Sequence, residues 1–134
     1  MDCIFCKIVA GEISSYKVYE NDKVTAFLDI LPISPGHTIV APKSHAADLE
    51  DLPDDDLCAL ALVIKKTGKA MMDGLDVKGY SVFLDNKDAA NQHVPHVHFH
   101  VVPRKEGDNL ARWPQGGYDE GEAEECLKRI TEKL

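Results

Sequence analysis

Residues 96–102 are the part of the chain that most constrains its fold, because histidine and apolar side chains alternate from His96 to Val101. In a β-strand, successive side chains point to opposite faces. The three histidines of this run would therefore share one face, and Val97, Phe99 and Val101 would pack on a core from the other. A proline brackets the run at each end, as prolines often do at strand ends. The run predicts a half-buried strand that carries a row of imidazoles.

Short β-favouring segments separated by turn residues predict four more strands, over residues 18–20, 24–29, 38–41 and 79–85. Asn21-Asp22 suits a hairpin turn between the first two. Because few of these strands are separated by crossover helices, we expect an α+β fold with a five-stranded antiparallel sheet.

Two helices are predicted. Pro53 and three aspartates begin a long helix, in which apolar residues follow at helical spacing as far as Met71. A C-terminal helix starts near Asp119, with acids in its first turn and bases in its last. With 134 residues the chain is most simply one domain. We expect a domain over residues 1–105 and a tail over residues 106–134 whose helix packs on it.

The long helix carries apolar residues outside its main stripe, at Cys58, Leu62 and Val63. A helix that is apolar more than one way round can be covered both by its own sheet and by another subunit. This pattern favours a homodimer, and the alternative is a deeply buried helix in a monomer.

Charge and composition restrict the partners and the compartment. A net charge of −8 argues against binding to nucleic acid or to anionic membranes, although a small phosphorylated ligand needs only a local site. No apolar run approaches the roughly 20 residues of a membrane span. The N-terminus lacks the layout of a secretory signal. Two of the four cysteines form a CxxC pair and the others lie in helical patterns, so we expect a reducing, cytoplasmic location.

The histidine row (His96, His98 and His100) suits two kinds of chemistry. Two imidazoles on a strand can chelate zinc, or one histidine can attack an electrophile while its neighbours hold the developing charge. No GxSxG, HExxH or GxxxxGK[ST] motif offers a competing site. Five polar residues in adjoining loops and strand ends could support the row: Asp29, His37, Asn86, Gln92 and His93.

Four segments of the sequence resemble the histidine-triad (HIT) family. They are CIFCKIVAGEI at residues 3–13, AFLDI at 26–30, PGHTIVAPKSH at 35–45, and QHVPHVHFHVVPR at 92–104. The resemblance implies the fold of that family and a nucleotide-binding enzyme that acts at an α-phosphorus. It implies that His98 is the nucleophile and forms a nucleotidyl-histidine intermediate.

The resemblance also assigns roles to the residues around His98. His100, His37 and Gln92 match groups that contact the phosphate, and Asp29 matches the acid that binds the ribose hydroxyls. Four apolar residues match positions that line the base pocket: Phe5, Ile8, Phe27 and Ile30.

The CxxC pair by itself is equally compatible with a redox pair and with half of a metal site. The resemblance to zinc-containing bacterial members of the family implies a ligand set of Cys3, Cys6, His45 and His96. Two thiolates and two imidazoles would form a closed tetrahedral site, which suits a structural zinc. The alternatives are two free thiols at a loose N-terminus, or a catalytic zinc on the histidine row.

Four residues depart from the family pattern. Ser14 replaces a usual proline, and Asn91 stands where a glycine usually precedes the glutamine. Asp85 takes the place of an amide side chain that meets the substrate, and Asn86 could substitute for that amide. His93 replaces a hydroxyl residue beside the leaving group, where an imidazole could protonate a departing amine or oxygen.

We therefore expect a homodimeric hydrolase that releases a nucleoside 5′-monophosphate from a purine nucleoside phosphoramidate or a related adenylylated molecule. It would use structural zinc and no organic cofactor. Two alternatives stay open: a dinucleoside polyphosphate hydrolase, and a nucleotide-binding protein with little turnover.

Overall fold

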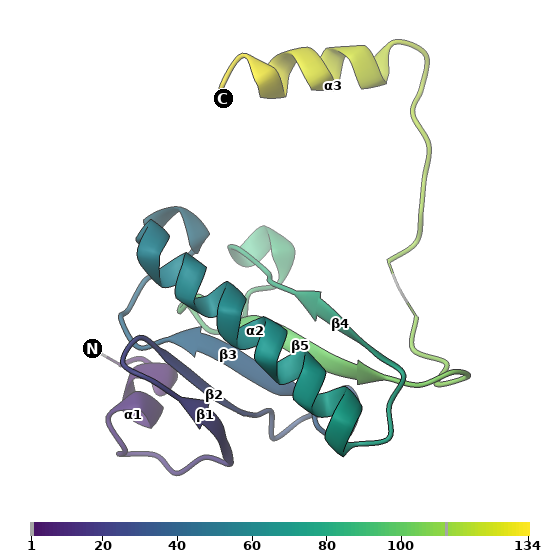
Figure 1. The fold of residues 1–134 in the computed structure, drawn as a ribbon. Coiled ribbons are helices and arrows are strands. Elements are labelled where there is room, and N and C mark those ends of the chain that lie inside the picture. Colours follow the sequence, from purple (N-terminus) through teal and green to yellow (C-terminus); the bar gives the residue numbers. More distant parts are fainter. Residues whose placement is uncertain (1, 112) are drawn as a thin grey trace.

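The computed structural model describes residues 2–111 and 113–134. Its centre is one sheet of five antiparallel strands in the order β1-β2-β3-β5-β4 (Figure 1). The strands are β1 (Lys17–Glu20), β2 (Val24–Leu28), β3 (Thr38–Pro42), β4 (Gly79–Phe83) and β5 (Phe99–Arg104). The α+β class and the five antiparallel strands expected from the sequence are confirmed.

The long helix α2 (Asp54–Gly74) covers one face of the sheet (Figure 1). Leu60, Val63 and Met71 are buried there against Val40 and Val101 of the central strands. Three aspartates occupy the first turn of α2, where negative charge suits the helix dipole. One of them, Asp56, ties the helix to the sheet by accepting hydrogen bonds from Lys23 at 2.9 Å and Ser44 at 2.8 Å.

The opposite face of the sheet carries a second, smaller core. The short helix α1 (Ile4–Val9) brings Cys3 and Phe5 against Phe27, Ile39 and Ala41. Neighbouring residues of β3 point to opposite faces, so Val40 enters the α2 core while Ile39 and Ala41 enter this one. α2 thus supports the sheet from one side and leaves the other side free for the histidines.

The strand that bears the histidine row begins later than the sequence suggests. Pairing with β3 joins Val40 to Phe99 and Ile39 to His100, and residues before Phe99 are outside the ladder. Val97 pairs with a loop instead of a strand, because its amide donates to the carbonyl of Ala46 in the loop after β3. The two-face pattern still holds, since Val97 and Val101 are buried in the α2 core and Phe99 packs against it.

The C-terminal helix α3 (Glu122–Thr131) forms as predicted but stands apart from the sheet in this chain (Figure 1). It buries none of its residues, and Leu127 and Ile130 are exposed. The expectation that α3 packs on the domain of its own chain is therefore not met here. Two 3₁₀ turns, Leu49–Asp51 and Asp88–Ala90, complete the structure. Among the described residues, no helix is long and apolar enough to cross a membrane.

Candidate functional site

A cavity of about 470 Å³ lies on the α1 side of the sheet, with His98 and His100 in its lining. Its volume falls within the range of pockets that hold small ligands. Most of the expected site residues line this one cavity: Phe5, Ile8, Phe27, Asp29, Ile30, Gln92, His93, His98 and His100. The structure therefore brings together segments from α1, the end of β2, the loop before β5, and β5 itself.

His98 is buried, and its ring orientation is determined by a backbone group. Its Nδ1 lies 2.7 Å from the carbonyl oxygen of His96. A carbonyl can only accept, so Nδ1 carries the proton and donates it to this bond. The other ring nitrogen, Nε2, then has a free lone pair in the neutral ring. This is the tautomer that a nucleophilic imidazole needs.

A chain of hydrogen bonds also sets the protonation of His37 and His100. The Ile33 amide donates to Nδ1 of His37 at 3.0 Å, so the proton of that ring is on Nε2. His37 Nε2 lies 2.9 Å from Nδ1 of His100 and donates to it. The proton of His100 is therefore on its own Nε2. In this arrangement both rings are neutral, and His100 has one N–H left to offer to a ligand.

The charges around the three rings agree with these neutral forms. Burial lowers the pKa of His98 and of His37 below the ordinary value. Burial, with the neighbouring rings of His98 and His37, lowers the pKa of His100 to about 4. Asp29, whose carboxylate lies 3.7 Å from Nε2 of His37, acts in the opposite direction. The site at neutral pH therefore combines neutral imidazoles with the carboxylates of Asp29 and Asp85.

Two aromatic rings pack against the imidazoles of His98 and His100. Phe5 of α1 meets His98 edge-on, with ring centroids 5.0 Å apart. Phe83 of β4 stacks on His100 with ring centroids 4.5 Å apart and an interplanar angle of 14°. Sequence reasoning missed Phe83, although its position opposite His100 follows from the pairing of β4 with β5.

One end of the cavity is apolar. The four residues expected in a base pocket (Phe5, Ile8, Phe27 and Ile30) all lie in its lining, and Ile30 is largely exposed at 80%. Sequence reasoning did not include six further aliphatic residues of this lining: Ile4, Ile13, Leu28, Leu31, Ile39 and Val94. Asp29 adjoins the apolar end and accepts a hydrogen bond from the Leu31 amide at 2.9 Å.

Asn86 does not line the cavity, contrary to expectation. Its side-chain oxygen accepts a hydrogen bond from the Leu49 amide at 2.9 Å, while Asp85 is in the lining. Side chains alternate along an extended segment, so a shift of one residue changes the face. Asp85 follows Phe83 at an interval of two, which is consistent with both residues facing the histidines.

The side chain of Gln92 is already engaged with the backbone of its own loop. Its NH₂ group donates to the carbonyls of Ala47 at 2.7 Å and Val94 at 3.0 Å. Its oxygen accepts from the Lys87 amide at 2.7 Å. Gln92 therefore braces the loop in this conformation, and a contact with phosphate would require it to give up one of these carbonyls.

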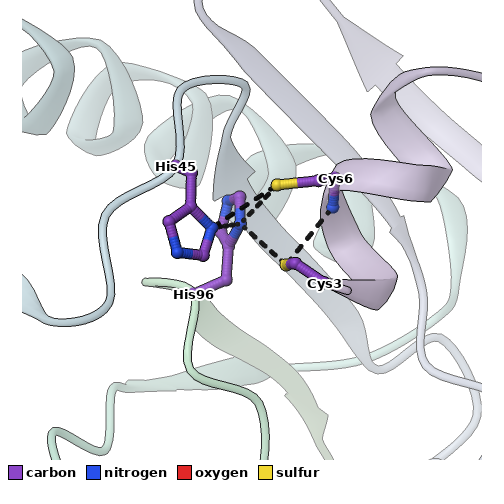
Figure 2. A group of neighbouring side chains, drawn as sticks. All are labelled: Cys3, Cys6, His45 and His96. Carbon is purple, nitrogen blue, oxygen red and sulfur yellow. Dashed lines mark hydrogen bonds between the residues drawn. The ribbon is translucent and has the colours of Figure 1, made fainter. Parts of the chain in front are cut away.

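The predicted metal ligands converge at a second place, beside the histidine row. Cys3, Cys6, His45 and His96 offer ligand atoms that all lie within 4.8 Å of one another. Figure 2 shows the two cysteines reaching from α1 and its N-terminal end toward the two imidazoles. Nδ1 of His96 is 3.4 Å from the Cys3 sulfur and 3.3 Å from Nδ1 of His45, and the Cys6 sulfur is 3.4 Å from Nδ1 of His45.

These separations fit a tetrahedral zinc centre. With bonds of about 2.3 Å to sulfur and about 2.0–2.1 Å to nitrogen, tetrahedral geometry places sulfur and nitrogen about 3.6 Å apart and two nitrogens about 3.3 Å apart. The tautomer of His96 fits as well, because its Nε2 donates to the Pro42 carbonyl at 2.8 Å and leaves Nδ1 free. The residues present could thus hold a metal ion.

A second group of possible metal ligands is less suitable. Asp29, His37 and His100 also offer atoms within 4.8 Å of one another. However, Nδ1 of His37 accepts the Ile33 amide hydrogen, so its Nε2 must carry the proton. A metal ion bound at Nε2 would have to displace that proton, and the ring would then carry no proton on either nitrogen. We therefore do not interpret this group as a metal site: Asp29 and His100 line the cavity, and His37 is hydrogen-bonded to His100.

Comparisons with known proteins agree with this geometry. A model of the HIT domain matches residues 10–107. An uncharacterized HIT-like protein of Methanocaldococcus jannaschii is 48% identical over 106 residues, which cover 79% of this chain and 81% of that protein. An adenosine 5′-monophosphoramidase of Candida albicans is 39% identical over 138 residues, which cover 98% of this chain and 91% of that protein.

Solved structures extend the similarity to the whole chain. A HIT family protein from Bacillus subtilis superposes with a TM-score of 0.91 at 33% identity, and covers 100% of this chain and 98% of its own. A zinc-bound histidine triad family protein from Mycobacterium smegmatis has a TM-score of 0.80 at 33% identity, and covers 100% of this chain and 99% of its own.

Proposed function

This chain belongs to the HIT family, and on that basis we propose that it is a hydrolase that releases nucleoside 5′-monophosphates by way of a nucleotidyl-His98 intermediate. The observation that carries the proposal is the bond from His98 Nδ1–H to the His96 carbonyl, which leaves Nε2 as a free nucleophile in a buried ring. The Candida albicans relative, named as an adenosine 5′-monophosphoramidase, supports this reaction class.

In the proposed reaction, Nε2 of His98 attacks the α-phosphorus and displaces the leaving group. The Nε2–H of His100 donates to a non-bridging oxygen of the phosphate, and His37 keeps His100 in that tautomer. Water then hydrolyses the phosphorus–nitrogen bond to His98. Preorganised neutral donors suit this task, because they need no reorganisation as negative charge develops at phosphorus.

We propose that the apolar end of the cavity binds the base and that Asp29 binds the ribose. Phe27 and Ile8 offer flat and aliphatic surface for a purine, and a carboxylate can accept two hydroxyl donors. The proposed substrate is a purine nucleoside phosphoramidate or a related adenylylated molecule. The name of the Candida albicans relative supports the adenosine part of this proposal.

The test uses a fluorogenic adenosine phosphoramidate with the wild type and His98→Ala. We expect turnover by the wild type, an adenylylated His98 after rapid quenching, and a loss of at least about 10³-fold in the variant. AMP binding should persist in the variant, because the base and ribose contacts remain. Equal rates for the two proteins would refute the nucleophile assignment.

One observation favours a second candidate, a nucleotide-binding protein with little turnover. The amide of Gln92 is committed to backbone carbonyls, and the carboxylate of Asp85 lines the cavity that must accept an anionic phosphate. Tight AMP binding together with negligible hydrolysis of phosphoramidates would support it. Parallel assays with diadenosine polyphosphates test the other enzyme candidate, a dinucleoside polyphosphate hydrolase.

We propose that the cluster of Cys3, Cys6, His45 and His96 holds a structural zinc ion. The ion would supply a closed four-coordinate link between α1 and the sheet. Burial and the adjacent Cys3 side chain raise the pKa of Cys6, so a metal ion at this place would have to displace the Cys6 thiol proton on binding. The zinc-bound Mycobacterium smegmatis relative supports the choice of metal.

Metal analysis of the wild type and of a Cys3→Ser, Cys6→Ser variant tests this site. We expect about one zinc per chain in the wild type and little in the variant. Full zinc content in the variant would instead place the metal on the histidine row.

We propose that the protein acts as a homodimer in the cytoplasm. Two features support association: β4 forms an edge of the sheet, and Leu62 on the outer side of α2 is 64% exposed.

Four cysteines without disulfides are in keeping with a reducing compartment. We also propose the division into a domain over residues 1–105 and a tail over 106–134, which the end of the matched HIT domain at residue 107 supports. A monomeric mass in light scattering would refute the dimer.

A further inference from the structure

Phe83 of β4 makes a contact with His100 that has no part in the proposed attack by His98. The two rings stack with centroids 4.5 Å apart and an interplanar angle of 14°. The other contacts between aromatic rings of described residues cross at 56° or more. Phe83 lies directly opposite His100 where β4 pairs with β5. The register of the sheet therefore brings the phenyl ring onto one face of the imidazole.

The packing of the sheet does not account for the place of Phe83. Its neighbour Leu84 packs against the α2 core, whereas Phe83 belongs to neither of the two core clusters. The phenyl ring is half-buried, and beside its stack with His100 it lines a second cavity of about 400 Å³, which His100 does not line. The contact with His100 therefore explains the position of this ring better than core packing does.

The imidazole of His100 needs a neighbour to fix its plane. The torsion that turns the ring of a histidine is broad, so the side chain does not fix the plane by itself. The hydrogen bond from Nε2–H of His37 to Nδ1 restrains one ring atom, at 2.9 Å. The rings of His37 and His98 meet that of His100 at 56° and 67°, so neither lies flat on it. Phe83 does, and its flat contact opposes rotation of the imidazole.

The plane of His100 matters because its remaining donor is directional. Nε2–H is the group that His100 has left to offer to a phosphate oxygen. A hydrogen bond weakens steeply when its angle falls toward about 120°. Functional groups also need to be held within about 0.5 Å and about 10–20° of their productive geometry. A small rotation of this ring would therefore weaken its contact with the phosphate.

The stack also favours the neutral form of His100. Burial is the largest cause of the low pKa of this ring, and Phe83 covers one of its faces. A protonated ring would carry a hydrogen on Nδ1 as well, which would face the Nε2–H of His37. The bond between the two histidines therefore requires the neutral form.

We propose that Phe83 is a positioning residue, whose stack holds the His100 imidazole so that Nε2–H meets a non-bridging oxygen of the α-phosphate. This rests on the proposed attack by His98. The bond to that oxygen strengthens as negative charge develops at phosphorus, so misalignment slows the adenylylation of His98 more than it weakens the binding of nucleotide.

The test compares two substitutions that keep an apolar side chain but differ in whether it is flat. Single-turnover assays with a fluorogenic adenosine phosphoramidate measure adenylylation of His98, and titration with AMP measures affinity. We expect Phe83→Leu to slow adenylylation by about 10-fold and to change the Kd for AMP by less than about 3-fold. Phe83→Tyr keeps the stack and should stay within about 2-fold of the wild type in both.

Phe99→Leu is the matched control for a general loss of packing. Phe99 lies in β5 next to His100, but it packs against the α2 core on the other face of the sheet. This variant should have a lower melting temperature and an adenylylation rate within about 2-fold of the wild type. A loss of rate as large as that of Phe83→Leu would show that weakened packing alone explains the effect.

A spectroscopic readout follows the His100 ring directly. Nitrogen NMR shifts of ring-labelled histidine distinguish the Nε2–H from the Nδ1–H tautomer at neutral pH. The wild type and Phe83→Tyr should show His100 in the Nε2–H form alone. Phe83→Leu should show a mixture of the two forms, because the ring can then turn away from His37. A loss of stability alone would not change this tautomer.

The outcomes separate this proposal from the one on which it rests. A rate or a His100 tautomer in Phe83→Leu that matches the wild type would overturn the positioning role, and so would a loss in Phe83→Tyr equal to that in Phe83→Leu. If the wild type forms no adenylylated His98, the proposed reaction is wrong. The NMR comparison then still decides whether Phe83 holds the His100 ring.

Discussion

Backbone groups decide which ring nitrogen carries the proton in His98 and in His37. The His96 carbonyl takes the Nδ1 proton of His98, and the Ile33 amide forces the proton of His37 onto Nε2. A backbone partner cannot change its donor or acceptor role, so each of these two bonds holds its ring in one neutral tautomer. The sequence alone predicts which histidines gather, because alternation and spacing carry that information. It does not predict their tautomers, since Ile33 and Pro42 lie far from the row in the chain.

His100 leads to a prediction on the pH dependence of stability. Its pKa falls from 6.5 to about 4 on folding, so the unfolded chain binds more protons between these values. The stability from keeping this ring neutral is complete above about pH 6.5 and is lost as the pH falls toward 4, at up to about 1.4 kcal/mol per pH unit. His100→Gln should show a shallower fall in the free energy of unfolding.

Urea denaturation of the wild type and His100→Gln across about pH 7 to pH 4.5 measures that slope. His37 and His98 also have lowered pKa values, so the variant should keep part of the dependence. Identical slopes for the two proteins would show that His100 does not titrate in this way.

At the scale of elements, the sequence predicts the regular strands well and the short N-terminal helix poorly. Alternation in β2 and β3 follows from one sheet with two covered faces, and residues such as Val40 and Ile39 obey it. α1 has six residues, too few to be stable alone, and its apolar residues show only that it docks. Tertiary contacts of Phe5 and of the metal-ligand cluster stabilise α1. These contacts leave no pattern in the local sequence, so the local sequence does not predict the helix.

The contact between α2 and β4 gives a second prediction. A Cβ at Gly68 would overlap the ring of Tyr80, so no side chain fits without moving that ring. Alanine in a helix normally stabilises by about 1 kcal/mol relative to glycine. Here Gly68→Ala should instead destabilise by about 1–3 kcal/mol.

Gly74→Ala is the matched control, because Gly74 lies in the same helix and its Cβ would meet nothing within 4 Å. Thermal unfolding of both variants gives the comparison. A gain in stability for Gly68→Ala would mean that α2 and Tyr80 separate easily.

At the scale of the whole molecule, α3 carries apolar side chains that its own chain does not bury. Its apolar stripe includes Leu127 and Ile130, which are 63% and 61% exposed. We expect deletion of residues 119–134 to weaken association, because the stripe is then no longer available to a second copy. The melting temperature of the monomer should be unchanged, since α3 buries no residue in its own chain. Light scattering over a dilution series that shows equal dissociation with and without α3 would contradict this.

Metal removal is the second prediction at this scale. If zinc binds only the folded chain, a chelator should lower the stability by about 2–4 kcal/mol and the melting temperature by roughly 6–15 °C. The Cys3→Ser, Cys6→Ser variant should melt near the chelated wild type and be insensitive to chelator. A wild-type melting temperature unaffected by chelator would argue against a structural metal.

His96 has a consequence that reaches beyond stability. Its ring faces the metal-ligand cluster through Nδ1, while its own carbonyl holds His98. Two binding events that share one residue are thermodynamically linked, and such linkage is reciprocal. If metal binding changes the affinity for nucleotide by some factor, nucleotide binding must change the affinity for the metal by the same factor. In a cell where zinc is scarce, the supply of substrate would then help to decide which copies of the protein retain their metal.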